Sequence, residues 1–246
     1  MHLNELPSFP IPCGLTVGSF DGVHLGHQML IKHLKAVVKG HPVAILTFLN
    51  HPSYLFAPQS PTSLICTPEH KKLLLTKYGA EIVLMIPFSK EFSETPFEEF
   101  LSILKKKLRF SHLILGTGAA FGKDRQGNEG NVSQLSKTLD FHVEYLAKFQ
   151  LGSLPVSSGR VRLAIETGDF QEVQMCLGRA YSLYGKIHRE KGNLIMDLPG
   201  ICLPPEGTYP IQIDATTGQA RVDRKNTRLL LEIEIPENTD FKEVIF

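Results

Sequence analysis

The chain has 246 residues, 42% of them hydrophobic, with 26 Lys and Arg against 25 Asp and Glu. That size allows one sizeable core, or a main domain with a smaller companion. The near-zero net charge excludes a protein that binds nucleic acid through bulk charge, because such binding needs an excess of clustered positive residues.

Cysteine spacing and hydropathy set further limits. The four cysteines lie far apart and form no CxxC pair, which argues against a disulfide framework or a cysteine metal site. No segment approaches the roughly 18 to 20 apolar residues of a membrane-spanning helix. The first residues lack the charged stretch and apolar run of a secretory signal. We therefore expect a cytoplasmic protein without a membrane partner; the sequence defines no oligomeric state.

The first two thirds of the chain alternate short apolar runs with longer amphipathic stretches. The residues VAILTF at 43–48 form a continuous run that is apolar apart from Thr47, as expected of a strand buried on both faces. A helical stripe of apolar residues follows the first strand, over 25–39. This βαβα rhythm predicts a parallel sheet with helices on both faces. The predicted strands are 15–18, 43–48, 81–86, 112–116 and 142–146, and the predicted helices are 25–39, 68–78, 96–107 and 161–167.

The pattern changes after about Leu177, where short strand candidates are separated by Gly, Pro and Asn. Such a tail is typical of a small barrel or sheet. We predict an α/β protein with a Rossmann-like parallel-sheet domain over residues 1–178, followed by a small all-β, barrel-like domain over 179–246. The predicted strands of the tail are 181–187, 194–198, 207–214, 219–223 and 229–235.

The first strand is followed by a segment suited to binding an anion. It reads GSFDGVHLGH over residues 18–27 and contains the turn signal Asp-Gly. The next helix is expected to begin near His24, so its free N–H groups and positive dipole end face the crevice. His24 and His27 share one face of the first turn, and Gly26 between them leaves room for a phosphate.

Two imidazole donors over an α-phosphate can stabilise charge during nucleotidyl transfer. Taken alone, HxGH also fits two ordinary histidines at a helix start. The pattern argues against a zinc site, because it lacks a third ligand at suitable spacing.

The segment GSFDGVHLGH resembles the signature of the bacterial bifunctional riboflavin kinase/FAD synthetase family. HxGH alone also marks the wider nucleotidyltransferase superfamily. The resemblance continues in order over roughly residues 14 to 185. TFLNHP at 47–52 is similar to TFxPHP, and SSGRVR at 157–162 is similar to SSTxIR, which contacts the ATP phosphates. Residues 116–127 match the frame of a flavin-contacting loop, GxDFxFGxxxxG, and LGRAYSLYG at 177–185 resembles the junction into the kinase module.

The resemblance implies a Rossmann-like nucleotidyltransferase domain that transfers AMP from ATP to FMN, giving FAD and pyrophosphate. Mg²⁺ would accompany ATP without a metal site of the protein's own, and no nucleic acid is involved. Taken alone, Arg162 fits a solvated face, His51 a turn and Phe121 a core position. The implied catalytic residues are His24, His27 and Arg162; the ATP-binding residues are Gly18, Ser19, Phe20, Gly26, Ser157, Ser158 and Arg162; the flavin-binding residues are Asp21, Asn50, His51, Gly116, Phe121 and Gly122.

The chain also departs from the family pattern. Gly118 and Ala119 stand where the flavin loop carries Asp or Asn and then Phe, and Gly159 replaces the Thr of SSTxIR. Losing a hydrogen bond to a ligand costs about 0.5–1.5 kcal/mol, so we expect weaker flavin binding. Another acceptor, such as nicotinamide or pantetheine phosphate, is a second hypothesis. A non-catalytic binding protein is a third, against which the intact His24, His27 and Arg162 argue.

The largest departure lies in the tail. The family's kinase module carries a GxPTAN motif for a second ATP and Mg²⁺, whereas Gly185 here is followed by KIHREKGN. We predict that riboflavin kinase activity is lost; the alternative is a bifunctional enzyme that still phosphorylates riboflavin. Glu232 or Glu234 corresponds to the kinase base, or else to the exposed positions of an amphipathic strand.

Overall fold

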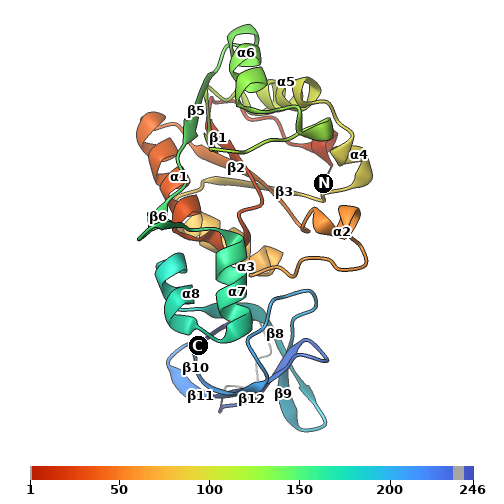
Figure 1. Ribbon diagram of the computed structural model, residues 1–246, viewed down its shortest axis with the longest axis vertical. Coiled ribbons are helices and arrows are strands. Elements are labelled where there is room, and N and C mark those ends of the chain that lie inside the picture. Colours follow the sequence, from red (N-terminus) through yellow and green to blue (C-terminus); the bar gives the residue numbers. More distant parts are fainter. Residues whose placement is uncertain (1, 235–240) are drawn as a thin grey trace. The chain divides into compact units, whose positions relative to one another are not determined.

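The computed structural model describes residues 2–234 and 241–246. These divide into two compact units (Figure 1). Unit 1 comprises Met1–Phe20, Gly26–Pro61 and Lys72–Gln150, and unit 2 comprises Asp21–Leu25, Thr62–Lys71 and Leu151–Phe246.

Unit 1 contains a five-stranded sheet in the order β3-β2-β1-β4-β5, with all neighbouring strands parallel. Each predicted strand of this region is confirmed to within one residue, because long apolar runs bounded by polar turns have few alternatives. The strands are β1 Gly14–Val17, β2 Val43–Phe48, β3 Ile82–Ile86, β4 His112–Gly116 and β5 His142–Leu146.

Helices cover both faces of this sheet. On one face, α5 buries Phe100, Leu101 and Leu104 against strand residues that include Leu15 and Leu46. On the other face α1 packs so closely that a Cβ on Gly14 would lie 2.6 Å from a methyl of Leu34. This explains why all six residues of β2 are buried. The helices are α1 Leu25–Val37, α2 Ser53–Phe56, α3 Pro68–Lys77, α4 Lys90–Ser93, α5 Phe97–Leu108 and α6 Glu129–Leu139, with 3₁₀ turns at Leu3–Glu5, Asp21–Val23 and Lys123–Arg125.

The strand order places β1 between β2 and β4, so the direction of winding reverses beside β1. In open α/β sheets ligands bind at this switch point, outside the carboxyl ends of the strands. The residues that follow β1 and β4 here are the FDGVH segment and the predicted flavin loop.

Unit 2 contains a closed barrel in the order β10-β11-β12-β9-β8-β13 (Figure 1). The predicted all-β tail is thereby confirmed as a barrel. Ile235, the last residue of one predicted strand, lies outside the described residues. The strands are β8 Ser182–Glu190, β9 Asn193–Asp197, β10 Gly207–Ile213, β11 Thr216–Asp223, β12 Arg228–Glu232 and β13 Phe241–Ile245; the short strands β6 Gln150–Leu151 and β7 Leu154–Pro155 form a separate pair.

The helices α7 Ser158–Thr167 and α8 Phe170–Leu177 group with the barrel. Phe170 stacks on Tyr181 and Phe246, with ring centroids 5.8 and 5.7 Å apart, and Tyr209 joins the same cluster. After Lys72 the compact units divide at residue 150/151, whereas the sequence patterns place the domain boundary at 178/179.

Candidate nucleotide and flavin site

The GSFDGVHLGH segment follows β1, and hydrogen bonds hold its first residues against β2. The amide of Gly18 donates to the Leu46 carbonyl at 3.1 Å, and the Thr47 hydroxyl donates to the Ser19 carbonyl at 2.9 Å. A Cβ on Gly18 would lie 3.2 Å from the Phe20 ring. The segment is therefore closely packed before it reaches the histidines.

The backbone of this segment is strained. Phe20, Gly22 and Val23 all have positive φ angles, of 48°, 77° and 43°. Such a conformation is rare for a β-branched residue like Val. Backbone strain of this kind persists only where surrounding structure enforces it, and it clusters at functional sites.

Within unit 2, hydrogen bonds to Asp21 hold this strained backbone in place. Its buried carboxylate accepts from the Ile65 amide at 2.8 Å and from Arg162 Nη2 at 3.0 Å. Its carbonyl oxygen accepts from the Ser158 hydroxyl at 2.8 Å. The structure thus brings three predicted site residues, Asp21, Ser158 and Arg162, together.

Arg179 holds the next part of the segment. Its guanidinium donates from Nη2 to the Gly22 carbonyl at 2.9 Å and from Nη1 to the Val23 carbonyl at 3.4 Å. We named no role for this residue from the sequence. The LGR motif that contains it was the available signal, but nothing local in that motif points to a loop more than 150 positions away.

His24 lies in an unusual electrostatic position. It is 5% exposed, and burial lowers its pKa to about 4, helped by the charge of Arg179 and opposed by a hydrogen bond with its own backbone. The imidazole is therefore neutral at neutral pH, and one of its nitrogens carries a proton to donate. α1 begins at the next residue, close to the predicted start, and its His27 packs against Phe20 at 4.9 Å between ring centroids.

The N-terminus of α7 carries the SSGRVR motif. Ser157 is the N-cap, and its hydroxyl oxygen accepts from the Arg160 amide at 3.2 Å. The Ser158 hydroxyl proton is committed to Asp21. Backbone N–H groups at a helix N-terminus form an anion site, so those of Ser158 and Gly159 are the natural phosphate donors at this position.

The two arginines of that motif have different environments. Arg160 pairs with Glu172 and donates to the Leu154 carbonyl, which ties α7 to α8 and to β7. Arg162 donates from Nε to the Ser63 carbonyl at 2.8 Å in addition to its bond with Asp21. A guanidinium has five N–H donors, and these two bonds use only two of them. Arg162 is therefore the better placed of the two to bind a phosphate.

In unit 1 the predicted flavin loop follows β4 and is tightly folded. Gly122 has φ 73°, and a Cβ there would lie 2.7 Å from the Phe97 backbone, so only glycine fits. Phe121 packs on Phe100 with ring centroids 5.3 Å apart. Gly116 and Gly118, by contrast, have no atom within 4 Å of an added Cβ. The loop is held rigidly at Gly122 and is open at the two positions where a ligand is expected.

Asn50 and His51 follow β2. The Asn50 amide exchanges two hydrogen bonds with the Phe88 backbone, at 3.1 and 2.8 Å. His51 Nδ1 accepts from the Ser53 amide at 3.1 Å and lies 2.8 Å from the Ser53 hydroxyl. These bonds fix the chain beyond β2.

Among residues 2–234 and 241–246, no helix combines the length and the apolar character needed to cross a membrane. Over the same residues, no group of three or more His, Cys, Asp or Glu is arranged to hold a metal ion.

A parallel sheet with HxGH after its first strand is the arrangement of a nucleotidyltransferase domain, and comparisons with known proteins specify the family. A model described as FAD synthetase matches residues 7–160, so this chain belongs to the FAD synthetase family.

Curated relatives agree with this assignment. The chain is 30% identical over 218 residues to the bifunctional riboflavin kinase/FMN adenylyltransferase of Haemophilus influenzae, covering 84% of this chain and 71% of that protein. It is 29% identical to the FAD synthetase of Listeria monocytogenes, covering 79% of each. The bifunctional relative of Listeria monocytogenes is 33% identical, with 75% of this chain and 60% of that protein covered.

A solved structure titled macrolide-efflux protein, from Streptococcus pneumoniae, matches with a TM-score of 0.82 at 22% identity. The match covers all of this chain and 87% of the other. At that identity the likeness shows the fold alone, with both the parallel sheet and the barrel included.

Proposed function

We propose that this protein transfers the AMP part of ATP to the phosphate of FMN, giving FAD and pyrophosphate. The observation that carries the proposal is the bonding of the FDGVH segment to α7, in which Asp21 binds Arg162 at 3.0 Å. This arrangement joins two motifs that are 141 positions apart in sequence. Family membership supports the same activity.

In the proposed reaction an oxygen of the FMN phosphate attacks the α-phosphorus of ATP. A bond forms between that oxygen and the α-phosphorus, the bond from the α-phosphorus to the bridging oxygen breaks, and pyrophosphate leaves with the bonding electron pair. His24 and His27 donate hydrogen bonds to the α-phosphate as its charge moves. Arg162 and the α7 N-terminus bind the β- and γ-phosphates and stabilise the departing charge.

Mg²⁺ enters with ATP as part of the substrate and takes its ligands mainly from phosphate oxygens and water, as this ion commonly does. Gly18, Ser19, Phe20 and Gly26 border the nucleotide.

The flavin contacts fall on the unit 1 loops, at His51, Gly116, Phe121 and Gly122, with Asn50 shaping the chain beside them. Asp21 takes a positioning role in this proposal instead of the flavin contact expected from the motif, because both of its carboxylate oxygens already accept hydrogen bonds.

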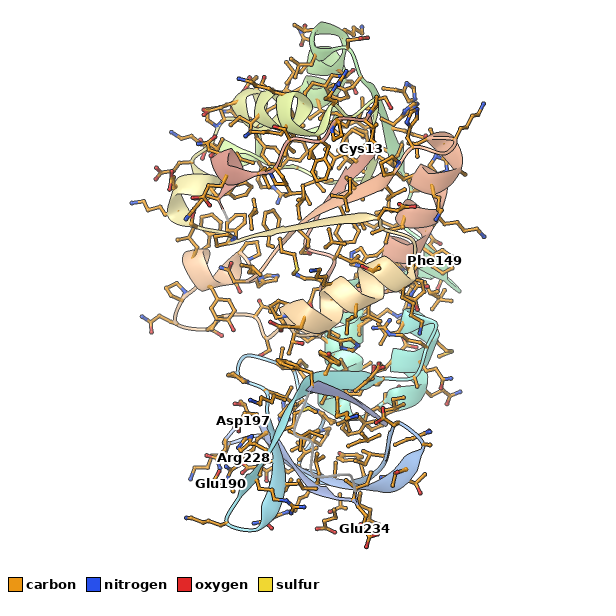
Figure 2. All side chains as sticks on the ribbon, turned by 180° about the vertical axis from the view of Figure 1, so that it is seen from behind. Cys13, Phe149, Glu190, Asp197, Arg228 and Glu234 are labelled. Carbon is orange, nitrogen blue, oxygen red and sulfur yellow. The ribbon has the colours of Figure 1, made fainter. Side chains whose placement is uncertain are left out.

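We further propose that the barrel has no riboflavin kinase activity. Where the family carries GxPTAN, β8 continues unbroken to Glu190 and turns back through the two-residue hairpin Lys191-Gly192. Figure 2 shows Glu190, Asp197 and Arg228 on the same side of the barrel, where Arg228 pairs with Glu190 at 3.4 Å. Glu190 at the end of β8 thus pairs with Arg228 of β12.

The barrel strands bury many apolar side chains. Their buried side chains are mainly aliphatic, as in small barrels whose interior is filled. Glu232 and Glu234 are exposed, and Glu232 alternates with the buried Leu231, which favours the amphipathic-strand interpretation over a kinase base. The buried aliphatic residues include Leu183, Ile187, Met196, Ile211, Ile213, Val222, Leu229, Leu231 and Val244.

The test is a coupled assay of pyrophosphate release with Mg·ATP and either FMN or riboflavin, with the flavin products separated by chromatography. FAD from FMN and no product from riboflavin is the expected result. FMN appearing from riboflavin would overturn the kinase proposal. Pyrophosphate release with nicotinamide or pantetheine phosphate, and not with FMN, would replace the proposed acceptor.

A further inference from the structure

A short segment, Ser63 to Cys66, connects the barrel to the residues proposed to bind ATP, and we name it the strap. Leu64 at its centre forms a parallel bridge with Ile201, which lies between β9 and β10. The Leu64 amide donates to the Gly200 carbonyl at 2.8 Å, and the Cys202 amide donates to the Leu64 carbonyl at 2.7 Å. Both backbone groups of Leu64 are therefore bonded to the barrel's connecting chain.

Ser63 and Ile65, on either side of Leu64, form their hydrogen bonds on the edge of the strap that faces away from the barrel's connecting chain. In an extended chain the N–H and C=O of one residue point to one edge, and those of its neighbours point to the other edge. The Ser63 carbonyl accepts from Arg162 Nε at 2.8 Å, and the Ile65 amide donates to Asp21 Oδ1 at 2.8 Å. One edge of the strap thus contacts the barrel, and the other edge contacts the transfer residues.

These bonds close a ring around Arg162. Its Nε is held by the strap and its Nη2 by Asp21, which is itself held by the strap. The side chain of Arg162 is only 15% exposed. A long side chain fixed at two nitrogens has already lost most of its rotamer freedom, so little more is lost when it binds a ligand.

The barrel end of this connection is also fixed by a side chain. The hydroxyl of the buried Tyr181 donates to the Cys202 carbonyl at 3.0 Å, and the Tyr181 ring packs on Phe170 and Phe246. A continuous bonded path therefore runs from Tyr181 through Cys202 and the strap to Arg162.

We propose that the barrel positions Arg162 for adenylyl transfer, acting through the strap. Tyr181, Cys202, Leu64 and Ser63 are positioning residues in this assignment, and Arg162 is the residue that touches substrate. The inference rests on the proposed transfer from ATP to FMN. It gives the barrel a function in a chain that lacks the kinase motif.

The test compares two conservative variants that lose the same kind of bond. Tyr181→Phe removes the hydroxyl bonded to Cys202. Tyr209→Phe removes a hydroxyl that donates to the Pro205 carbonyl at 2.9 Å, in the same aromatic cluster but away from the strap. Loss of one such bond corresponds to about a 2- to 12-fold change. We expect kcat/KM for Mg·ATP to fall by that factor in Tyr181→Phe and to stay within twofold in Tyr209→Phe.

A double-mutant cycle separates positioning from general destabilisation. Lys cannot make both bonds of the Arg162 fork, so Tyr181→Phe should have no further effect on kcat/KM when Arg162 is replaced by Lys. An equal fall in both backgrounds, or an equal fall in Tyr209→Phe, would overturn the proposal. So would unchanged kinetics in Tyr181→Phe.

A second readout does not depend on FAD synthesis. The Nε–H of Arg162 can be followed by ¹⁵N NMR, assigned by its loss in Arg162→Lys, and its exchange with water should be faster in Tyr181→Phe than in the parent or in Tyr209→Phe. Faster exchange without any FAD production would support the positioning role and refute the proposed reaction. Unchanged exchange in a protein that makes FAD would refute the positioning role and leave the reaction standing.

Discussion

Replacing Gly118 with Asn should tighten FMN binding. The family loop carries Asp or Asn at this position, so the change restores a polar group that this chain lacks. The site accepts a side chain without a clash, because nothing lies within 4 Å of an added Cβ. Its φ of 82° is left-handed, a region that Asn adopts more readily than other residues with a side chain.

The size of the effect follows from one hydrogen bond to the flavin. A net gain of about 0.5–1.5 kcal/mol corresponds to a Kd for FMN that is roughly 2- to 12-fold lower. Flavin fluorescence titration measures this Kd directly, and calorimetry with Mg·ATP should show unchanged nucleotide affinity. The same value measured for riboflavin would show whether the gain depends on the FMN phosphate.

Gly152→Asn is the matched control. Gly152 also has a positive φ, 62°, and open space around it, but it lies between β6 and β7. FMN affinity should not change in this variant. An unchanged or weaker Kd for FMN in Gly118→Asn, with normal folding, would refute the assignment of residues 116–127 to the flavin.

Three further predictions follow from the geometry. Gly122→Ala places a side chain on a left-handed residue and against the Phe97 backbone, so the free energy of unfolding in urea should fall by about 2–5 kcal/mol. Gly40→Ala is the control, because Gly40 has a φ of 94° but open space around it, and it should lose only about 1–2 kcal/mol. Equal losses in the two variants would contradict the clash. Burial lowers the pKa of His24 from 6.5 to about 4, so between these pH values the folded protein binds fewer protons than the unfolded chain. The free energy of unfolding should therefore fall by about 3 kcal/mol as the pH drops from 6.5 to 4, with no such loss above pH 6.5. Urea unfolding of His24→Gln should show a correspondingly smaller loss over this range, and an identical pH dependence would refute the burial argument. His27→Ala should reduce kcat by about 10²–10³-fold, as for other donors to a reacting oxyanion, while the affinity for Mg·ATP measured by calorimetry changes little. Comparable losses of kcat and of Mg·ATP affinity would mean that His27 binds the nucleotide without stabilising the transition state.

The sheet and the barrel could be predicted from the sequence because their signals are local. Five of the six residues at 43–48 are apolar, and the only place for such a strand is between two layers of helices. α6 was missed because it has only three apolar residues in 11, which makes a sparse stripe. β13 follows the undescribed residues 235–240, and its short sequence FKEVI carries no turn signal that separates it from a loop.

The candidate site was only partly predictable. The motifs gave His24, His27 and Arg162 through resemblance, but the contacts that hold them join distant positions. Asp21 bonds to residues 44 and 141 positions away, and no local pattern encodes those partners. The roles of Ser63 and Ile65 rest on backbone atoms, so their residue types carry no signal. Buried charge networks of this kind become visible only when tertiary structure brings the chain segments together.

Adenylyl transfer to FMN is tested directly by following the label of ATP into the flavin. With FMN and ATP labelled at the α-phosphate, label should appear in FAD in equal amount to the pyrophosphate released. With riboflavin and ATP labelled at the γ-phosphate, no labelled FMN should form. Absence of α-label from the flavin product would contradict adenylyl transfer to FMN, and γ-label in FMN would contradict the loss of kinase activity.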